Sequence, residues 1–293
     1  MDELKKLILN GFDGSSLDKF AVIIGSNPSK TARSPLLWNS AFKAHGLNMR
    51  MLPMDIEKKN LEKVIDVLSN SKKFIGGSVT IPFKNDLSNI LKKNLTQEAK
   101  KIGAINCIFR DKMNELKGTN TDGEASIVAF KKKFGDINGK KILLMGLGGA
   151  GKAVLNYFLK DLKKGKIYLT TLNKSKFKNI NDTSKIEFID WENKNKILTE
   201  IDIVINCTSL GFDTKLDETP LNKNELNFLK KTSIVYDIIY NPIETKLLKI
   251  SKELSLNTLN GLEMNLLQAS IAFNYVVKTN NQNITENAMK GAK

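Results

Sequence analysis

The segment Lys141-Ile-Leu-Leu-Met-Gly-Leu-Gly-Gly-Ala-Gly151 decides how this chain is expected to fold. It runs from an apolar stretch into a G-x-G-x-x-G pattern, and helical spacing follows through Leu159. In a strand–turn–helix unit, Gly146 allows a tight turn, Gly148 lets a phosphate approach the backbone, and Gly151 lets helix and strand pack closely. The helix N-terminus offers free N–H groups to that phosphate.

A second apolar stretch at residues 166–171 predicts the next strand, so the whole pattern predicts a βαβ unit that binds a dinucleotide. The alternative is a tight turn between strand and helix in an ordinary α/β protein. The residues expected to contact the cofactor phosphates are Gly146, Gly148, Gly149, Ala150 and Gly151.

The end of the second strand indicates which dinucleotide is bound. Folds that bind NAD usually place an Asp or Glu there for the ribose 2′-hydroxyl. This chain has Asn173-Lys174-Ser175 instead, and Asp182 is the only acid in the following loop. A lysine and small polar side chains suit a 2′-phosphate, so NADP is favoured over NAD, with Asn173, Lys174 and Ser175 as contacts. The alternative is a solvated loop in a lysine-rich chain.

The charge of the chain comes almost entirely from lysine. The 293 residues carry a formal net charge of +15, and arginine occurs only at Arg33, Arg50 and Arg110. Surfaces that recognise nucleic acids favour clustered arginine with interleaved aromatic residues, and neither is found here. We therefore expect no specific nucleic-acid partner, and only a weak affinity for polyanions at low salt.

The cysteine and histidine content and the lack of long apolar runs restrict the cellular compartment and the catalytic chemistry that we expect. Two distant cysteines, Cys107 and Cys207, suit a reducing compartment. Neither a signal peptide nor a membrane-spanning run is recognised, so we expect a cytoplasmic protein without a membrane partner. We expect it to act as a monomer or homodimer. The single histidine, His45, precedes Gly46 at an expected helix end. Ser-His-Asp hydrolysis and multi-histidine metal sites are excluded, and no metal is expected.

The pattern of elements predicts an α/β fold with two domains. Strands are expected at residues 20–24, 49–54, 74–81 and 104–110, with helices at 36–44, 61–68 and 86–101 between them. This alternation predicts a mostly parallel sheet. A helix over 121–134 then leads into the dinucleotide unit, with further strands at 201–205 and 234–239. The last helix, 263–277, has apolar residues that need a partner surface, which the first domain could provide.

Seven short motifs carry a family resemblance. They are Ser34-Pro35, Gly77-Ser-Val-Thr-Ile-Pro-Phe-Lys84, Gly103-Ala-Ile-Asn106, Asn120-Thr-Asp-Gly123, Asn206-Cys-Thr-Ser209, Tyr240-Asn-Pro242, and Gly261-Leu-Glu-Met264 with Gln268. In this order and spacing the chain resembles the shikimate dehydrogenases over nearly its full length. The resemblance implies an N-terminal α/β substrate domain (1–121, completed by 262–293) and a Rossmann-type NADP-binding domain (122–261), with the active site in the cleft between them.

The resemblance also implies the reaction, a reversible reduction of 3-dehydroshikimate to shikimate with NADPH. Hydride transfer leaves an alkoxide that needs a proton, so a positioned acid is required. Lys84 matches the catalytic lysine of the family and Asp122 matches its partner. The alternative for Thr121-Asp-Gly-Glu124 is a capping box at the start of the following helix, and both interpretations can hold together.

The other site residues are assigned by the same resemblance. Those implied to bind substrate are Ser34, Thr80, Asn106, Tyr240 and Gln268, beside Asp122, since hydroxyls, amides and carboxylates supply the donors and acceptors that a polyol needs. The loop carrying Thr208 is implied to line the nicotinamide, and Gly261 is placed with the cofactor residues. Taken singly, these residues have structural explanations, such as strand-edge or helix-packing roles.

The sequence departs from the family pattern at the segment expected to bind the substrate carboxylate. Ala32 stands where the first serine of Ser-x-Ser belongs, and the preceding loop, 25–28, is one residue longer than usual. Either Thr31 or Arg33 is a candidate for the missing contact, and an arginine binds a carboxylate more strongly than a hydroxyl does. Elsewhere, Ser78 replaces an asparagine, and Lys174 replaces an arginine and loses its bidentate grip.

Four alternatives remain open. A related dehydrogenase acting on quinate or another cyclic hydroxy-carboxylate is supported by Ala32. A folate-interconverting dehydrogenase is disfavoured because the first domain has no Tyr-x-x-x-Lys pair. An NADP-sensing module without chemistry is disfavoured because Lys84, Asp122 and Asn106 are all present. A nucleic-acid binder, indicated by net charge alone, comes last.

Overall fold

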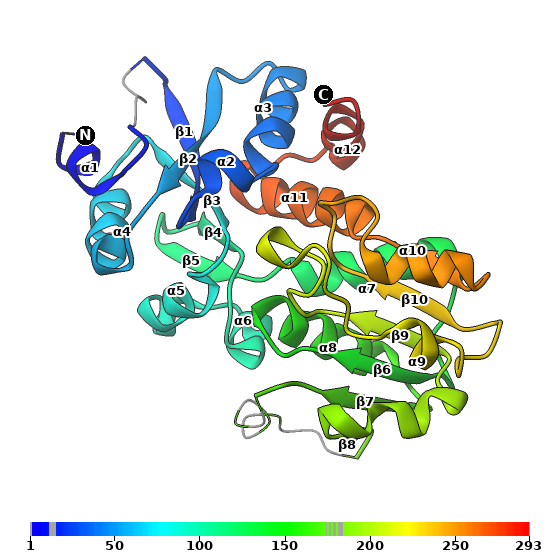
Figure 1. Ribbon diagram of the computed structural model, residues 1–293. Coiled ribbons are helices and arrows are strands. Elements are labelled where there is room, and N and C mark those ends of the chain that lie inside the picture. Colours follow the sequence, from blue (N-terminus) through cyan, green and yellow to red (C-terminus); the bar gives the residue numbers. More distant parts are fainter. Residues whose placement is uncertain are drawn as a thin grey trace. The chain divides into compact units, whose positions relative to one another are not determined.

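The computed structural model describes residues 2–11, 16–173, 175, 177, 180 and 184–292. The chain divides into two compact units (Figure 1), which are Met1–Thr121 with Leu266–Lys293 (unit 1) and Asp122–Asn265 (unit 2). The sequence analysis placed the first boundary between residues 121 and 122 and the second between 261 and 262. The structure groups residues 262–265 with unit 2 instead.

The sheet of unit 1 is mixed, with the strand order β2-β1-β3-β4-β5. Its strands are β1 (Lys19–Gly25), β2 (Met49–Asp55), β3 (Phe74–Val79), β4 (Cys107–Arg110) and β5 (Leu116–Thr119). β2 and β3 run parallel to β1, whereas β4 is antiparallel to both β3 and β5. As expected, β1, β2 and β3 form a parallel part of the sheet. The sequence analysis did not recognise β5, which pairs antiparallel with β4 at the edge of the sheet.

A tight turn makes β4 and β5 antiparallel. The carboxylate of Asp111 accepts the N–H groups of Met113 and Glu115, both at 2.9 Å. Asn114 takes a positive φ of 64°, which asparagine tolerates better than most residues. The chain therefore reverses within a few residues instead of crossing over through a helix.

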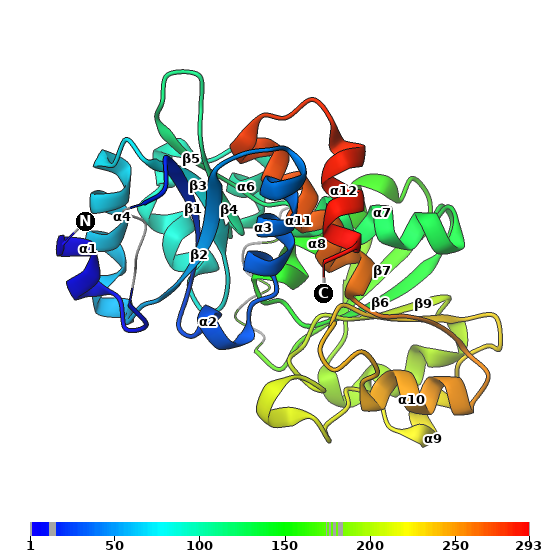
Figure 2. The ribbon, with the colours of Figure 1, turned by 90° about the horizontal axis from the view of Figure 1, so that it is seen from above.

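The helices of unit 1 lie on both faces of its sheet (Figure 2). They are α1 (Asp2–Leu7), α2 (Pro28–Thr31), α3 (Ser34–Ala44), η1 (Lys58–Asn60), α4 (Leu61–Asn70), α5 (Lys84–Ile90), η2 (Lys92–Asn94), α6 (Gln97–Ile102), α11 (Leu262–Val277), whose first four residues group with unit 2, and α12 (Gln282–Lys290). The region 86–101, expected to be one helical stretch, is divided among α5, η2 and α6. A new N-cap causes the break, since the hydroxyl of Thr96 accepts the N–H of Ala99 at 3.3 Å.

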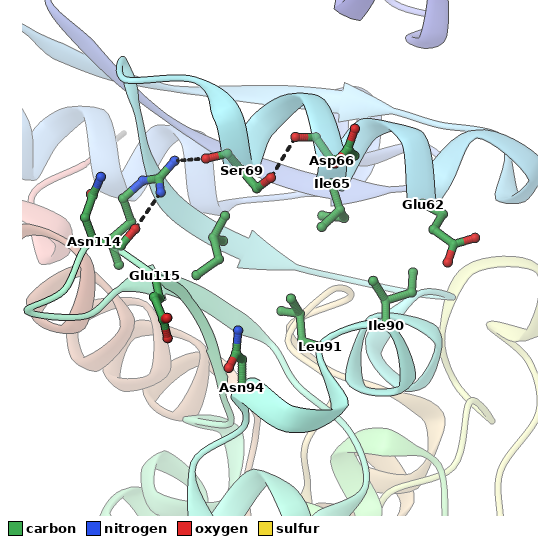
Figure 3. Close-up of a pocket in the computed structure, with 11 residues that line it drawn as sticks. Glu62, Ile65, Asp66, Ser69, Ile90, Leu91, Asn94, Asn114 and Glu115 are labelled. Carbon is green, nitrogen blue, oxygen red and sulfur yellow. Dashed lines mark hydrogen bonds between the residues drawn. The ribbon is translucent and has the colours of Figure 1, made fainter.

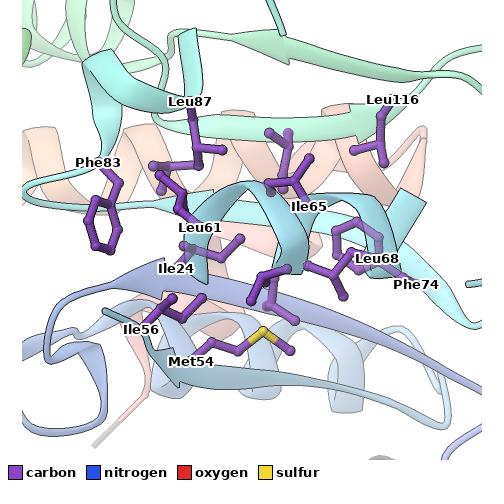
Figure 4. Close-up of a cluster of buried hydrophobic side chains, with 14 of the residues drawn as sticks. Ile24, Met54, Ile56, Leu61, Ile65, Leu68, Phe74, Phe83, Leu87 and Leu116 are labelled. Carbon is purple, nitrogen blue, oxygen red and sulfur yellow. The ribbon is translucent and has the colours of Figure 1, made fainter. Parts of the chain in front are cut away.

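One face of the sheet packs against α1, α4 and α5. Figure 4 shows this cluster, in which Ile24, Met54 and Phe74 of the strands meet Leu61 and Leu68 of α4. All five side chains are buried. The predicted 61–68 helix therefore buries its apolar face as expected for an amphipathic helix.

The other face packs against α3, α11 and α12. Trp38 and Phe42 of α3 contact Phe273 of α11, with ring centroids 5.2 and 5.0 Å apart. His45 ends α3, stacks on Phe273, and shares a 2.9 Å hydrogen bond with Thr285 of α12. From residue 266 onward, the last long helix groups with unit 1 and packs on this face of its sheet.

Unit 2 contains a parallel sheet with the strand order β11-β10-β9-β6-β7-β8. Its strands are β6 (Lys141–Met145), β7 (Lys166–Thr170), β8 (Ile186–Phe188), β9 (Ile203–Asn206), β10 (Ile234–Asp237) and β11 (Asn257–Leu259). Counted from β6 as the first, the order from the β8 edge is 3-2-1-4-5-6, which is that of dinucleotide-binding α/β folds. The strand order reverses between β6 and β9.

Helices cover both faces of this sheet. They are α7 (Asp122–Phe134), α8 (Gly149–Asp161), η4 (Trp191–Glu200), η5 (Asp213–Lys215), α9 (Lys223–Leu226) and α10 (Lys246–Glu253). On one face, Phe130 of α7 contacts Phe158 of α8 and Tyr236 of β10. No helix in the described part of either unit is long and apolar enough to span a bilayer.

Candidate active site

The carboxyl ends of β1 and β3 lie side by side in unit 1, and several predicted site residues follow them. Gly25 ends β1, and a Cβ added there would lie 2.5 Å from Cγ2 of Thr80, which follows β3. Glycine at position 25 therefore permits this close approach. Ser34 is buried and is the first residue of α3, which follows β1 after the short helix α2.

Lys84 begins α5, four residues after Thr80. The N–H of Phe83 bonds to the Thr80 carbonyl at 3.0 Å, which closes the turn between β3 and α5. The carbonyl of Lys84 accepts the N–H of Ile105 at 2.9 Å. The backbone of Lys84 is thus held beside the residue that precedes Asn106, and its side chain is half-buried.

Asn106, Thr121 and Gln268 form a buried hydrogen-bonded cluster. The Nδ2 group of Asn106 donates to Thr121 Oγ1 at 2.9 Å and to Gln268 Oε1 at 3.2 Å. Its Oδ1 accepts the N–H of Thr121 at 2.8 Å, and the Thr121 hydroxyl donates to the Gln268 carbonyl at 3.0 Å. Two predicted site residues are therefore brought together. Thr121 was not predicted as a site residue, although it lies within one of the motifs.

The segment that lacks the family serine is held by Asp55 at the end of β2. The carboxylate of Asp55 accepts both the N–H and the hydroxyl of Ser29 in α2. The Thr31 hydroxyl donates to the Asn27 carbonyl at 2.9 Å, and Ala32 packs on the apolar core. Arg33 is half-buried, and among the described residues its guanidinium forms no hydrogen bond or ion pair. Of the two candidates for the missing contact, only Arg33 keeps its polar group available.

In unit 2, the glycines after β6 have distinct geometries. Gly146 has φ of +98°, and a Cβ there would lie 2.8 Å from the Cys207 carbonyl oxygen. A Cβ on Gly151 would lie 2.2 Å from the Gly146 carbonyl oxygen, whereas a Cβ on Gly148 would meet nothing within 4 Å.

The start of α8 therefore has open space beside Gly148, whereas Gly151 is packed tightly against the backbone of Gly146. The N-cap residue, Gly148, has no side chain to cap the first N–H groups of this helix, which includes Gly149 and Ala150. Free N–H groups beside open space fit a dinucleotide pyrophosphate.

The loop after β7 contains the residues expected at the 2′-phosphate. The side-chain oxygen of Asn173 accepts the N–H and the hydroxyl of Ser175, at 3.0 and 2.6 Å. Both residues are exposed. Lys174 and Asp182 lie outside the described residues.

The carboxyl ends of β9 and β10 carry the remaining predicted cofactor and substrate residues of unit 2. Asn206 ends β9, and its Oδ1 accepts the N–H of Thr208 at 3.0 Å and the Thr208 hydroxyl at 2.7 Å. Tyr240 follows β10 and is half-buried. A Cβ on Gly261 would lie 2.0 Å from the Ile238 carbonyl oxygen, so the chain there passes directly against the exit of β10.

The last residue of β10, Asp237, is a buried carboxyl that the sequence analysis missed. It accepts hydrogen bonds from Asn206, from Thr245 and from the N–H of Ile239. Burial raises its pKa to about 6, although these hydrogen bonds act in the opposite direction. The available signal was an acid within the apolar stretch 234–239.

Asp122, the expected partner of Lys84, opens α7 of unit 2. It is buried, with 5 % of its surface exposed. A Cβ on the next residue, Gly123, would lie 2.4 Å from the Ala153 carbonyl oxygen, so α7 and α8 touch at this point. Close contact between the two helices fixes where Asp122 lies within unit 2.

A pocket of about 430 Å³ lies elsewhere in unit 1, between α4, the α5–η2 segment and the β4–β5 hairpin (Figure 3). Arg110 lines it, but this guanidinium donates to the carbonyls of Leu68, Ser69, Ser71 and Asn114. Its Nε also donates to the carbonyl of Phe74, at the opposite end of β3 from Thr80. The pocket contains none of the predicted site residues.

Both units match models of one protein family. Residues 23–108 match the family model described as shikimate dehydrogenase substrate binding domain, and residues 129–246 match that described as shikimate / quinate 5-dehydrogenase. The shikimate dehydrogenase (NADP(+)) of Carboxydothermus hydrogenoformans is 37% identical over 260 residues, covering 87% of this chain and 90% of that protein. This chain belongs to the shikimate dehydrogenase family.

Solved structures of the shikimate dehydrogenase family agree with the fold. A crystal structure of shikimate dehydrogenase in complex with NADP⁺ has a TM-score of 0.80 and 30% identity, covering 93% of this chain and 94% of that one. A shikimate 5-dehydrogenase from Listeria monocytogenes, in complex with shikimate and NAD, has a TM-score of 0.80 and 27% identity, covering 96% and 98%.

Proposed function

We propose that this chain is an NADP-dependent shikimate dehydrogenase that reversibly reduces 3-dehydroshikimate to shikimate. The observation that carries the proposal is the buried Asn106–Thr121–Gln268 cluster beside the backbone of Lys84. Its side-chain amides and hydroxyl are held in fixed orientations, which suits recognition of ring hydroxyls. Membership of the family and the strand order of unit 2 support the same reaction.

In this proposal the two units have separate roles. Unit 1 binds substrate through Ser34, Thr80, Asn106 and Gln268, and Tyr240 of unit 2 adds a further contact. Unit 2 binds NADP through the glycines around the start of α8, Asn173–Ser175, Thr208 and Gly261. The open space above Gly148 and the uncapped helix start fit the phosphates.

The proton chemistry is assigned to Lys84 and Asp122. Bound NADPH supplies the hydride for the substrate ketone. Lys84 then gives a proton to the oxygen that becomes the hydroxyl, and takes it back in the reverse direction. Asp122 is assigned the role of orienting this ammonium group through a charge-assisted hydrogen bond.

The preference for NADP over NAD rests on the polar, uncharged side chains of Asn173 and Ser175 and on Lys174. An acid at this point would repel a 2′-phosphate. We propose further that the enzyme works in the cytoplasm, as a monomer or homodimer. Its two cysteines are free and buried, which supports a reducing compartment.

The test is NADPH formation, followed by absorbance, with shikimate or quinate as substrate. Lys84→Ala is the matched variant, and calorimetric titration with NADP⁺ shows whether it still binds cofactor. We expect turnover of shikimate that falls by about 10²–10⁴-fold in Lys84→Ala, with NADP⁺ affinity nearly unchanged. A parent protein that binds NADP⁺ but oxidises neither compound would contradict the proposal.

A second candidate is a dehydrogenase of the same family for quinate or another cyclic hydroxy-carboxylate. Ala32 favours it, because the segment that would hold the carboxylate lacks its first serine hydroxyl. A higher kcat/KM for quinate than for shikimate would support this candidate. If Ala32→Ser then raises kcat/KM for shikimate, the serine position sets the choice of substrate.

A further inference from the structure

The carboxyl group of Asp237 lies at the ligand-binding edge of unit 2 without facing solvent. In open α/β sheets, ligands bind outside the carboxyl ends of the strands, where the strand order reverses. Here the reversal lies between β6 and β9, and β10 is the next strand. Asn206 and Asp237 are the last residues of β9 and β10 and are paired in register. Asp237 is fully buried, so it acts on a ligand only through other residues.

Three hydrogen bonds join Asp237 to separate segments at this edge. Oδ1 accepts from Nδ2 of Asn206 and from the N–H of Ile239, both at 3.1 Å. Oδ2 accepts from the hydroxyl of Thr245 at 2.7 Å, and Thr245 is the N-cap of α10. One carboxyl group thus connects the loop after β9, the loop that leads to Tyr240, and the start of α10.

The hydrogen bond to Asp237 helps to fix the orientation of the Asn206 amide, which in turn positions Thr208. An ionised carboxylate only accepts hydrogen bonds, so the amide of Asn206 must turn its NH₂ group to Asp237. Its oxygen must then face the other way, where it accepts the N–H and the hydroxyl of Thr208. The Thr208 oxygen in turn accepts the N–H of Leu210 at 3.1 Å. Nδ2 of Asn206 also donates to the Leu210 carbonyl at 3.3 Å, so Asp237 and Leu210 together set the orientation of this amide and with it the shape of the 206–210 loop.

This loop also contacts the glycine turn after β6. A Cβ on Gly146 would lie 2.8 Å from the Cys207 oxygen and 2.9 Å from the Thr208 nitrogen. The turn proposed to receive the pyrophosphate and the loop that Asp237 holds are therefore direct neighbours. In this fold the adenosine half of the dinucleotide binds on the side of β7 and β8. The nicotinamide half binds on the other side of the pyrophosphate, over β9 and β10.

We propose that Asp237 is a positioning residue for the nicotinamide half of the dinucleotide, acting through Asn206 on the loop that carries Thr208. The inference rests on the proposed binding of NADP by unit 2. The inference predicts different effects on the two halves of the ligand. Asp237 constrains the β9–β10 side of the site and makes no described contact with the β7–β8 side.

The experiment compares two ligands by calorimetric titration. NADP⁺ contains the nicotinamide, whereas 2′,5′-ADP contains only the adenosine half with its phosphates. Asp237→Ala removes all three acceptor interactions. We expect it to weaken NADP⁺ binding by about tenfold or more, and 2′,5′-ADP binding by less than about twofold. Asp237→Asn should restore NADP⁺ binding to within about threefold, since its oxygen still accepts from Asn206 and Ile239 while its NH₂ donates to Thr245.

Ser233→Ala is the matched control. Ser233 is fully buried just before β10, and its hydroxyl donates to the Ile201 carbonyl at 2.7 Å. It loses one buried hydrogen bond at the opposite end of the same strand and should bind both ligands like the parent. If Asp237→Ala does not fold, Thr245→Val removes the bond to Oδ2 together with the N-cap bond that Thr245 accepts from Leu248, and leaves both bonds to Oδ1 in place. A loss of about threefold confined to NADP⁺ is then expected.

The outcomes separate the inference from the proposed function. A parent protein that binds neither ligand overturns both. If the parent binds both ligands, the result for Asp237→Ala (or for Thr245→Val in its place) decides the positioning role. Parental NADP⁺ affinity in the variant, or an equal loss of affinity for both ligands, overturns the positioning role and leaves the proposal of NADP binding intact. Loss confined to NADP⁺ with rescue by Asp237→Asn supports the inference.

Discussion

At the start of α3, Arg33 carries a guanidinium next to the position where Ala32 supplies no hydroxyl. The Thr31 hydroxyl is already bonded to the Asn27 carbonyl, so it is engaged within α2. Arg33 is half-buried and free of hydrogen bonds and ion pairs among the described residues. An arginine can bind a carboxylate through two parallel hydrogen bonds, which a serine cannot do.

Arg33→Ala is therefore expected to raise KM for shikimate by about ten- to a hundredfold, with little change in kcat. Steady-state kinetics at saturating NADP⁺ measures both constants. Arg50→Ala, on strand β2, serves as the control for loss of one positive charge. Equal KM values for Arg33→Ala and the parent would show that the carboxylate is bound elsewhere.

Asp237 gives a second prediction at the residue scale, the pH dependence of stability. Its pKa is about 6 in the folded protein, against 3.8 for an ordinary aspartate, so the folded state binds more protons between these values. The contribution of the protonated carboxyl to stability is then lost as pH rises through the folded pKa. Burial also raises the pKa values of the neighbouring Cys207 and Tyr236, so both stay uncharged over this range.

The free energy of unfolding of the parent should consequently fall by about 2 kcal/mol relative to Asp237→Asn between about pH 4 and pH 6. Urea unfolding of both proteins across this range measures the difference. Parallel curves for parent and variant would mean that Asp237 does not titrate there.

The element that begins at Gly149 combines two demands, close packing and open space. A Cβ on Gly151 would lie 2.2 Å from backbone, whereas a Cβ on Gly148 would meet nothing and its φ of −74° suits any residue. The two glycines are therefore required for different reasons, one for folding and one for ligand approach.

A pair of alanine variants separates these reasons. Gly151→Ala should destabilise unit 2 by about 1–3 kcal/mol, because the backbone must shift to admit the methyl group. Gly148→Ala should keep parental stability and lose NADP⁺ affinity, because its methyl group occupies the space proposed for the phosphate. Thermal unfolding and calorimetric titration measure the two effects. Parental NADP⁺ affinity in Gly148→Ala would place the phosphates elsewhere.

Elements with strong local signals were predictable from the sequence. β6 and α8 follow from the apolar run and glycine pattern at 141–151, and the end of α11 that packs on unit 1 follows from its apolar spacing. The β4–β5 hairpin was missed, although Asp111 and Asn114 are turn-forming residues, because β5 is short and contains Lys117 and Gly118.

The bonding of individual side chains was harder to predict, because it depends on distant partners. Arg110 looks like a surface cation, but it bonds to carbonyls of α4 and β3 some 40 residues earlier, including those of Ser69 and Phe74, which lie 41 and 36 residues away. Asp237 meets Asn206 only because β9 and β10 pair in register, 31 residues apart. No local pattern contains this information.

At the scale of the whole molecule, the two units should respond differently to ligand. Each contains one of the two tryptophans, Trp38 in unit 1 and Trp191 in unit 2. Trp191→Phe leaves a fluorescence probe of unit 1, and Trp38→Phe leaves one of unit 2. NADP⁺ at a hundredfold excess over Kd should stabilise the unit 2 transition by about 2.7 kcal/mol, because it binds the folded unit only.

The probe in unit 1 should show a much smaller shift in its urea midpoint. Each variant without ligand is its own control, since both substitutions change the reference stability. Equal shifts for both probes would mean that the chain unfolds as one cooperative body rather than as two units.

The division of unit 1 into residues before and after unit 2 has a consequence for synthesis on the ribosome. Trp38 and Phe42 are made early, but Phe273, which covers them, is made only after the whole of unit 2. Unit 2 is continuous in sequence, so it can fold while the α3 face of unit 1 is still uncovered. Newborn chains thus carry an exposed aromatic surface for as long as translation of residues 122–265 lasts. Slow translation of that stretch would prolong their need for chaperones, even though the finished protein is unaltered.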